Sequence, residues 1–413
     1  MPSTVILSSA RTPIGKLGGG LSTLDATELG GTAISAALER AEVAPDQIQH
    51  VVMGQVLQAG QGQIPSRQAQ IKGGIPKEIS SETINKVCAS GIRSACLLDN
   101  AIRVGDLDVG LAGGMESMSK APYLLKQARF GFRMGDAKAL DAMINDGLTN
   151  PFSGKQMFVE ATEVGDELEM TRVDLDRWAL RSHERAISAT DEGRLPEEIV
   201  PVTIKGKKGD TVVEIDEGPR RDTSLEKLAA RPGLVGKEGS HPAGNSPGVN
   251  DGAGALVVAS DEWAKANGKT ALARIVAHAQ VADDFPYLAR TPANAAKKAL
   301  EKAGLKVDDI DLWEINEAFA SVTLNSMRML GLDENKVNVN GGAVALNSVR
   351  MLDADPEAAN VNGGAVALGH PIGASGGRIL GTMVHELRRE GGGLGLAAIC
   401  SGGGQGDALL VEV

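Results

Sequence analysis

The chain has 413 residues, more than one ordinary hydrophobic core accommodates, so its length favours two or three compact units. Hydrophobic residues make up 42% of the chain, aromatic residues only 3%, and 52 residues are glycine, which predicts an interior of small aliphatic side chains with close backbone approaches. The net charge of -11 argues against general binding of nucleic acid or of anionic membranes, because both need a basic surface.

Targeting and redox signals indicate a cytoplasmic protein. No apolar run reaches the roughly 18 residues of a membrane span, the first residues lack the pattern of a signal or transit peptide, and the last three, VEV, form no retention or peroxisomal signal. Three cysteines, Cys88, Cys96 and Cys400, occur without CxxC spacing. The sequence therefore predicts neither a disulfide framework nor a metal site, and a functional cysteine would act as a thiol.

The first 120 residues alternate short β-branched runs with stretches of helical period. We expect strands over 3–9 and 48–56, with a helix over 25–43 between them. The same rhythm continues through 81–105 and 107–119. This βαβ pattern predicts an α/β fold with a mostly parallel sheet.

The rhythm breaks at about residue 121, where a polar helix over 174–193 and a hairpin-like run over 202–218 predict an inserted domain. After it the alternation returns, and the expected elements are a strand over 271–282, a helix over 291–305, a strand turning into a helix over 310–330, a helix over 374–391, and strands over 394–400 and 407–413. We therefore predict two similar α/β halves, residues 1–120 with 245–270 and residues 271–413, which flank an inserted domain of residues 121–244.

A direct repeat lies in the second half. Residues 325–346 align with residues 347–368 without a gap, and 15 of the 22 positions are identical. A repeat this short indicates a local tandem duplication and not a solenoid. The first copy continues a predicted helix and the second runs into His370. We therefore expect residues 360–368 to hold the native strand or turn and roughly 332–353 to be surplus, looped out at the surface, with a register that can slip by a few residues.

Cys88 stands in NKVCASG, where a strand end passes through small residues into a helix. A thiol at a helix N-terminus faces unpaired N–H groups and the positive end of the helix dipole, which favours the thiolate and nucleophilic attack. A small buried hydrophobic residue is an equally good interpretation of this position alone. Cys96 lies two turns inside the same helix among apolar residues and is interpreted as core.

Among the six histidines, His370 is the best partner for a reactive thiol. It is flanked by Gly369 and Pro371 and is followed by the glycine-rich helix start GASGG, where a ring can be held at an open cavity. His183 and His385 are expected on the polar faces of their helices.

Two further positions carry polar groups that could contact a ligand. Cys400 ends a predicted strand and enters SGGGQG, where the glycines from Gly402 onward let backbone N–H groups approach a ligand as an oxyanion site requires. A hairpin turn with a buried cysteine explains the same residues. Asn316, where a strand becomes a helix, is either a helix N-cap or a group that holds a water molecule against a substrate carbonyl.

The stretch GASGG also satisfies the G-x-S-x-G pattern that would expose Ser375 as a hydrolase nucleophile. That pattern needs a strand immediately before the serine and a histidine well downstream, and the only later histidine is His385, within the following helix. We therefore interpret the match as accidental. The sequence has no G-x-G-x-x-G at a strand-to-helix turn and no G-x-x-x-x-G-K-[ST], so dinucleotide redox chemistry and nucleotide hydrolysis lack support.

Motifs along nearly the whole chain resemble the thiolases, acyl-CoA:acetyl-CoA C-acyltransferases, and within them the acetyl-CoA acetyltransferase type. In chain order they are INKVCASG, AGGMESMS, AGNSPGVNDGAGA, EINEAFAS, NVNGGAVALGHPIGASGGR and ICSGGGQGDA. The resemblance implies a layered αβαβα fold of two duplicated α/β halves, in which the inserted region is the loop domain that covers coenzyme A. It also implies a homodimer or homotetramer, no bound metal or redox cofactor, and coenzyme A thioesters as substrates.

The same resemblance implies a role for each residue singled out above. Cys88 would be the nucleophile that carries the acyl group, His370 its base, and Cys400 the acid and base at the α-carbon of the second acetyl-CoA. His370 with a water molecule held by Asn316 would form one oxyanion hole, and the N–H groups of Cys88 and Gly402 would form the other.

Coenzyme A contacts also follow from the resemblance. They are Met157, Arg220, Ala243, Ser246 and Phe319. Arg220 and the basic run at 205–209 would supply local positive charge, although a solvated hairpin tip is the better explanation of that run. Three positions depart from the family pattern and leave the acyl-chain range open: Gln156, Pro247 and Leu288.

The expected reaction is the condensation of two acetyl-CoA to acetoacetyl-CoA and CoA, or the reverse thiolysis, through an acyl thioester on Cys88. A 3-ketoacyl-CoA thiolase of fatty-acid β-oxidation is the alternative within the same family. A hypothesis of another class is a coenzyme A-binding scaffold whose catalysis is impaired by the duplication. No nucleic-acid or membrane partner is expected.

Overall fold

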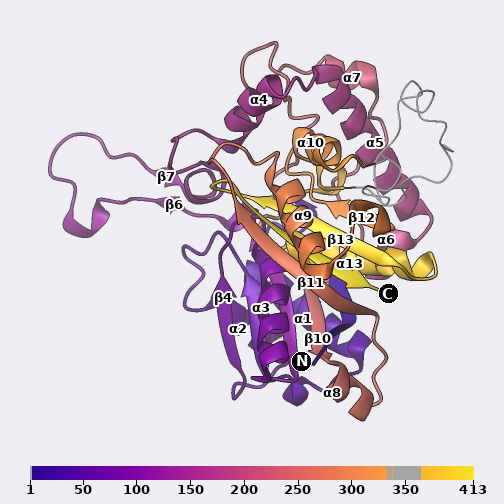
Figure 1. Cartoon of the computed structure of the whole chain (residues 1–413). Helices are drawn as coiled ribbons and strands as arrows, with labels where there is room; N and C mark the ends of the chain where they lie inside the picture. Colours follow the sequence, from indigo (N-terminus) through magenta and orange to yellow (C-terminus); the bar gives the residue numbers. More distant parts are fainter. Residues whose placement is uncertain (1, 333–336, 338–363) are drawn as a thin grey trace.

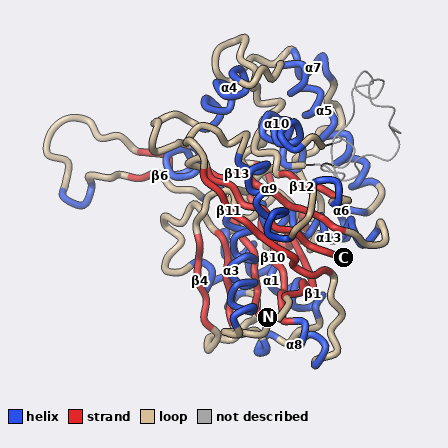
Figure 2. Tube along the Cα trace, viewed as in Figure 1, coloured by secondary structure: helices blue, strands red, loops and turns tan. Residues whose placement is uncertain are grey.

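The computed structural model describes residues 2–332, 337 and 364–413 (Figure 1). Its centre is a sheet of ten strands in the order β12-β13-β14-β11-β1-β10-β5-β3-β4, with β2 paired to β10 (Figure 2). The strands of the first half are β1 Thr4–Arg11, β2 Gly15–Lys16, β3 His50–Gly54, β4 Ser80–Ile84, β5 Val109–Ser117 and β10 Asn250–Ser260. The strands of the second half are β11 Ala273–Ala282, β12 Leu312–Ile315, β13 Leu394–Ser401 and β14 Gln405–Glu412.

The prediction of a mostly parallel sheet is wrong. β3 pairs in parallel with β4 and β5, and β12 pairs in parallel with β13, whereas the other pairings described in this sheet are antiparallel. The reason is that β10, which follows the inserted region, lies between β1 and β5 and runs antiparallel to both. A local alternation of strands and helices does not reveal a strand that returns from so far along the chain.

Helices cover both halves and also separate them, which confirms the layered αβαβα fold. α1 Ala26–Ala41 and α2 Pro65–Lys72 pack on the first half, and α9 Thr291–Ala303 with α10 Ala320–Leu330 pack on the second. α3 Ser90–Val104 and α13 Ser375–Arg389 lie between the halves, where their side chains share one core with strands of both. Among the described strands, the two half-sheets join where β1 meets β11, through two residue pairs.

The inserted region contains the predicted polar helix and hairpin. Its main elements are α4 Met157–Glu167, α5 Arg172–Asp191, α6 Arg194–Glu198, β8 Val202–Ile204, β9 Thr211–Val213 and α7 Leu225–Ala229. α5 begins after Thr171, whose side chain accepts a hydrogen bond from the N–H of Asp174 and so caps the helix. In Figure 1, α4, α5 and α7 stand above the sheet, and the segment with β6 Tyr123–Leu124 and β7 Leu140–Asp141 projects to one side.

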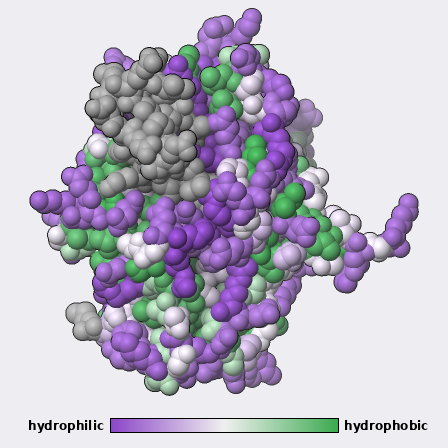
Figure 3. Space-filling model, turned by 90° about the vertical axis from the view of Figure 1, so that its right-hand side faces the viewer, coloured by the Kyte–Doolittle hydropathy of each residue, from purple (hydrophilic) through white to green (hydrophobic). Residues whose placement is uncertain are grey.

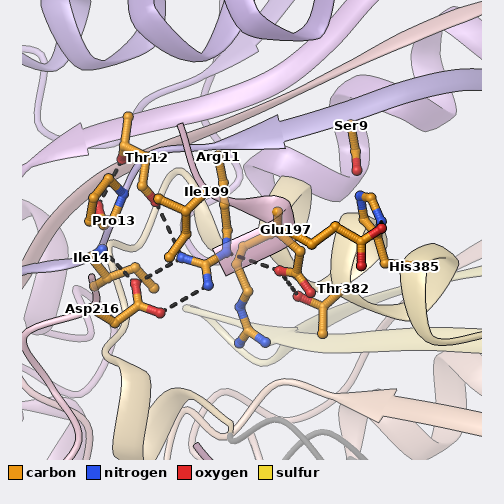
Figure 4. Close-up of polar contacts among 12 residues, drawn as sticks. Ser9, Arg11, Thr12, Pro13, Ile14, Glu197, Ile199, Asp216, Thr382 and His385 are labelled. Atoms are coloured by element: carbon orange, nitrogen blue, oxygen red, sulfur yellow. Dashed lines mark hydrogen bonds and ion pairs between the residues drawn. The ribbon is translucent and has the colours of Figure 1, made fainter. Parts of the chain in front are cut away.

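A buried arginine holds the inserted region on the sheet (Figure 4). Arg11, at the end of β1, is 3% exposed, and it donates through Nη1 and Nη2 to Asp216 at 2.8 and 2.9 Å and through Nε to Glu198 at 3.0 Å. The hydroxyl of Thr382 in α13 also donates to Glu198, at 2.7 Å. Both carboxylates belong to the inserted region, so this cluster fixes that region relative to the core.

The expected surplus segment lies mostly outside the described residues, but two of its residues are described and contradict its predicted start. Leu332 packs against the core around α9 and α10. Val337 is completely buried and forms a parallel bridge with Trp313 of β12. The first copy of the repeat thus contributes to the sheet edge, and any surplus begins after Val337.

The second copy leads directly to His370, as expected. Its described residues include α12 Ala365–Leu368, which is buried and helical where a strand or turn is predicted. In the described part of the chain, no helix is both long and apolar enough to cross a lipid bilayer. Figure 3 shows a face on which hydrophilic residues predominate and hydrophobic ones form small separate areas.

Candidate active site

The turn before α3 holds Cys88 in a strained backbone. Val87 has a φ of 45°, in the left-handed region, which costs a residue other than glycine about 1–3 kcal/mol. Asn85 Oδ1 accepts a hydrogen bond from the N–H of Val87 at 2.9 Å, and Ser90 Oγ donates to the carbonyl of Val87 at 2.7 Å. These contacts keep the turn in its strained form, with Cys88 2% exposed. As predicted, the thiol precedes a helix that follows a strand.

The protonation of Cys88 differs from the expectation. Its place at a helix N-terminus predicts a thiolate, but burial raises the pKa of Cys88 to about 12, although the backbone N–H groups of Cys88 and Gly402 bond to the sulfur and partly offset this rise. A thiolate without surrounding water loses more solvation free energy than two N–H dipoles return. Cys88 is therefore a neutral thiol at pH 7 and needs a base when it attacks. Cys96 is completely buried in the core, as predicted.

His370 reaches the site from the turn before α13. Its N–H donates to Asn250 Oδ1 at 2.9 Å, and its Nδ1 lies 2.6 Å from Ser375 Oγ. Because Ser375 Oγ donates to the carbonyl of Pro371 at 3.1 Å, it accepts from Nδ1–H and leaves the lone pair on Nε2. Nε2 is buried and has no hydrogen-bond partner among the residues that the structure describes. Burial, with a contribution from Arg378, lowers the pKa of His370 to about 3, so the ring is neutral at pH 7.

Glycines bring the two turns together. A Cβ atom on Gly376 would lie 2.0 Å from the backbone nitrogen of Ile92, and one on Gly91 would lie 2.7 Å from that of Gly377. The first turns of α3 and α13 therefore touch backbone to backbone, which side chains would prevent. Since the thiol precedes one of these helices and the imidazole precedes the other, the contact explains the small residues in both motifs.

Cys400, at the end of β13, approaches Cys88 from the second half. It is completely buried; burial first, and then the proximity of Cys88, raise the pKa of Cys400 well above its ordinary value. The next residues form the predicted hairpin into β14, with Gly403 and Gly404 in left-handed conformations. The N–H of Gly402 bonds to the sulfur of Cys88. Both interpretations of this stretch therefore apply: it is a tight hairpin with a buried cysteine, and it presents an N–H to the thiol.

Asn316 follows β12 with its side chain unused by the fold. α10 begins at Ala320 with Phe319 as its N-cap, so the interpretation of Asn316 as an N-cap is wrong. Asn316 is 1% exposed, and neither polar atom of its side chain has a partner within the described ranges. A buried amide in this state indicates a place for a water molecule or a substrate group. Its N–H donates to the carbonyl of Ala398 at 2.9 Å, which ties it to the strand of Cys400.

A mainly apolar cavity of about 200 Å³ contains Cys88 and His370. The predicted coenzyme A contacts that line it are Met157, Ser246 and Phe319, and two of the positions that depart from the family pattern also line it, Gln156 and Pro247. A second cavity of about 180 Å³ shares Met157 with the first in its lining. Gly402 and Leu288 line this second cavity.

Two predicted coenzyme A contacts, Arg220 and Ala243, do not line these cavities. Arg220 is half-buried, its N–H donates to Nδ1 of His183 at 3.2 Å, and burial lowers the pKa of its guanidinium. Ala243 is exposed, a short way along the chain from Ser246. The prediction that His183 lies on a polar helix face is wrong, because it is 1% exposed. His385 is also largely covered, with a side-chain exposure of 13%.

Sequence reasoning missed the side chains that hold the turn of His370. Glu116, completely buried in β5, accepts hydrogen bonds from the N–H groups of Val56, Leu57 and Gly373 at 3.0, 3.1 and 2.9 Å. Ser375 orients the imidazole and is itself buried, which fits the view that its hydrolase-like motif is accidental. A carboxylate within the small and apolar run VGLAGGMES was a signal that could have identified Glu116.

Glu317, next to Asn316, connects the inserted region with the second repeat copy. It is completely buried and accepts hydrogen bonds from Trp178 Nε1 at 3.0 Å, from Ser182 Oγ at 2.8 Å and from the N–H of Val366 at 3.0 Å. The helix α12 that leads into His370 is thus bound to α5.

The fold, with a cavity that receives a cysteine from one half and a histidine from the other, defines an acyl-transferring enzyme. The chain belongs to the thiolase family. The family model "Thiolase, N-terminal domain" matches residues 4–262, and "Thiolase, C-terminal domain" matches residues 269–349 and 345–413. Each of the two C-terminal matches contains one copy of the repeat. The resemblance inferred from the motifs is therefore confirmed.

Full-length relatives agree with this assignment. A protein of Cupriavidus necator named "Acetyl-CoA acetyltransferase" is 45% identical, with 100% of each chain covered. One of Syntrophomonas wolfei with the same name is 43% identical over 99% of this chain and 98% of its own. Among solved structures, the "Crystal structure of the Bacillus anthracis acetyl-CoA acetyltransferase" superposes with a TM-score of 0.92 and 37% identity, covering 100% of this chain and 99% of that one.

Proposed function

We propose that this thiolase is an acetyl-CoA C-acetyltransferase that condenses two acetyl-CoA to acetoacetyl-CoA and CoA, and catalyses the reverse thiolysis, through an acyl thioester on Cys88. The observation that carries the proposal is the meeting of two thiols and an imidazole at one site. Cys88 and His370 line the same cavity, Nε2 of His370 has no partner among the described residues, and Cys400 packs in one cluster with Met157 and Phe319, which also line that cavity. The full-length relatives named acetyl-CoA acetyltransferase support this reaction over the alternatives of β-oxidation and of an inactive scaffold.

In the first half-reaction the sulfur of Cys88 attacks the thioester carbonyl of acetyl-CoA and its proton passes to His370 Nε2. The C–S bond to coenzyme A breaks, and Cys400 gives its proton to the departing sulfur. The raised pKa of Cys400 supports this role, because a thiol that is protonated at pH 7 can act as an acid. The products are acetyl-Cys88, free CoA, a protonated His370 and a thiolate on Cys400.

In the second half-reaction the Cys400 thiolate removes a proton from the methyl group of a second acetyl-CoA. The resulting carbanion attacks the carbonyl of acetyl-Cys88, the C–S bond breaks, and the sulfur of Cys88 recovers its proton from His370. The N–H groups of Cys88 and Gly402 would bind one oxyanion, and His370 with a water molecule on Asn316 the other. The hydrogen-bond donors of both oxyanion holes are buried and preorganised, and such donors are needed to stabilise the anion that forms when a weakly acidic carbon loses its proton.

Substrate contacts, location and assembly belong to the same proposal. Met157, Ser246 and Phe319 would contact the pantetheine, and Arg220 and Ala243 the more distant nucleotide. No bound cofactor enters the reaction, and a cytoplasmic location suits three free cysteines.

A homodimer or homotetramer would cover the edge strand β4 and the projecting tip, where Phe130 is 89% exposed. Light scattering on the purified protein tests this, and a monomer would contradict it.

The test of function is thiolysis of acetoacetyl-CoA compared with that of a long-chain 3-ketoacyl-CoA. We expect turnover of the short substrate, and intact mass spectrometry should find the acetyl group on Cys88 and not in Cys88→Ala. Acetyl-CoA should protect Cys88 from iodoacetamide. A clear preference for the long chain would favour the β-oxidation alternative, and slow, equal labelling of Cys88 and Cys96 would favour an inactive scaffold.

A further inference from the structure

The two loops that carry the cysteines come from opposite halves of the chain and are bonded to each other away from the cavity. The nucleophile turn, residues 85–89, follows β4, and the Cys400 hairpin, residues 400–405, joins β13 to β14. They meet at the sulfur of Cys88, which the N–H of Gly402 contacts. A second contact lies next to it, because Ser401 Oγ donates a hydrogen bond to the carbonyl of Lys86.

The side chain of Lys86 makes the third contact. Its Nζ forms an ion pair with Asp407 Oδ1 and also donates to Gln280 Oε1 at 2.8 Å. Asp407 is completely buried in β14, opposite Ile399 in β13. The residue across from Asp407 thus directly precedes Cys400. Lys86 therefore contacts both strands that the hairpin joins, Ser401 of β13 through its carbonyl and Asp407 of β14 through its ammonium group. The side chain of Asp407 is fully buried and that of Lys86 is only 14% exposed, so water screens this ion pair little and its geometry constrains both partners.

Packing adds to these polar contacts. A Cβ atom added to Gly402 would lie only 3.2 and 3.3 Å from the two methyl carbons of Val87. The strained Val87 therefore packs closely against the hairpin glycine. Ser90 Oγ accepts a hydrogen bond from the N–H of Lys86 at 2.8 Å, which fixes Lys86 relative to the start of α3. The nucleophile turn therefore has little freedom to move without the hairpin.

We propose that Lys86, Ser401 and Asp407 are positioning residues that lock the nucleophile turn to the Cys400 hairpin and so set the distance between the two N–H donors that act on the oxyanion. The inference rests on the proposed function, in which one donor, the N–H of Cys88, belongs to the turn and the other, that of Gly402, to the hairpin. An oxyanion hole needs donors within about 2.7–3.1 Å of the oxygen. Two donors on separate loops meet that requirement only if something fixes the loops to each other.

The first test measures turnover of the full-length protein with Lys86→Met, Asp407→Asn and Ser401→Ala. We expect kcat for acetoacetyl-CoA thiolysis to fall about 10- to 100-fold in the first two and about 10-fold in Ser401→Ala, with KM changed less than about twofold. The double variant Lys86→Met with Asp407→Asn should lose no more than the worse single one, because both remove the same contact. Lys265→Met, which breaks the exposed pair with Asp261, is the matched control and should leave kcat unchanged.

A second measurement does not depend on turnover. Without the lock, the N–H of Gly402 moves away from the sulfur, so the pH profile for alkylation of Cys88 by iodoacetamide should shift upward and the rate at pH 8 should fall about 3- to 10-fold. Ser401→Ala retains the buried charge pair and keeps the test valid if Lys86→Met does not fold. Variants that melt earlier but keep the wild-type kcat and alkylation profile would overturn the lock. Wild-type protein that fails to cleave acetoacetyl-CoA would instead overturn the proposed function, and the alkylation profiles would still decide on the lock.

Discussion

At the scale of single residues, the orientation of His370 depends on one hydroxyl group. Ser375 Oγ is its only described partner at Nδ1, and this bond leaves Nε2 free to accept the thiol proton. Ser375→Ala should therefore allow the wrong tautomer and lower kcat for thiolysis about tenfold, with KM nearly unchanged, since a hydrogen bond of this kind contributes about 0.5–1.5 kcal/mol. Steady-state kinetics with acetoacetyl-CoA measures both constants.

A matched control for that substitution is Ser326→Ala. Ser326 is also a buried helical serine, and its Oγ donates to the carbonyl of Val322 at 2.7 Å in the same way that Ser375 bonds to Pro371. The control should lose a similar amount of stability and keep its activity. Equal losses of kcat in the two variants would mean that Ser375 only stabilises the fold.

The low pKa of His370 predicts an unusual pH profile. A base whose pKa is about 3 stays unprotonated as the pH falls from 8 to 5, so acetylation of Cys88 should not slow in this range because of His370. A histidine with the ordinary pKa of about 6.5 would lose roughly 30-fold at pH 5. Single-turnover release of CoA from acetyl-CoA measures the rate. An acid limb near pH 6.5 that disappears in His370→Gln would show that water reaches the ring.

At the scale of elements, the buried ion pairs between β1 and the inserted region should contribute more to the free energy of unfolding than an exposed ion pair does. Arg11→Met leaves the carboxylates of Glu198 and Asp216 buried without their cation, which should lower the free energy of unfolding by about 3–5 kcal/mol. Urea denaturation measures this loss. The exposed pair of Arg274 with Glu412 offers the control, because Arg274→Met should cost less than about 1 kcal/mol. Similar losses of unfolding free energy in the two variants would contradict the conclusion that Arg11 holds the inserted region on the sheet.

Element types and the chemical motifs could be predicted from the sequence because they depend on nearby residues. The strand before Cys88, the helix after His370 and the hairpin after Cys400 all follow from local apolar period and glycine content. Strand order, the burial of His183 and the pKa of Cys88 could not be predicted. Each depends on segments that are far apart in the chain. The strand order depends on the pairing of β10 with β1, the burial of His183 on its contact with Arg220, and the pKa of Cys88 on the side chains that exclude water from the thiol.

At the scale of the whole molecule, three buried neutral histidines should make the fold sensitive to acid. Burial lowers the pKa of His183 and His370 to about 3 and that of His241 to about 4. Below about pH 6.5 the unfolded chain binds protons that the folded chain does not, so stability falls as the pH falls, by at most about 2 kcal/mol per histidine at pH 5. Melting temperatures from pH 7.5 to 5 test this slope, which His183→Gln should make shallower; an unchanged slope would contradict the prediction for His183.

The repeat gives a prediction about the whole chain that depends on which copy supplies the sheet edge. Val337 of the first copy is buried beside Trp313, and its counterpart in the second copy is Ala359. Two deletions of 22 residues each restore a single copy of the repeat. Removal of 338–359 keeps Val337, whereas removal of 332–353 puts Ala359 in its place.

The two deletions should therefore differ in stability although both retain His370 and its turn. Loss of the buried methyl groups of Val337 and of the packing of Leu332 should make the 332–353 deletion about 2 kcal/mol less stable than the 338–359 deletion in urea. The 338–359 deletion should match or exceed the full chain, because a shorter connection has a smaller closure entropy. If the 332–353 deletion is instead the more stable one, the second copy of the repeat supplies the sheet edge in solution as well as the residues that lead into the active site. Thiolysis rates near that of the full chain in the 338–359 deletion would mean that the duplicated residues take no part in catalysis.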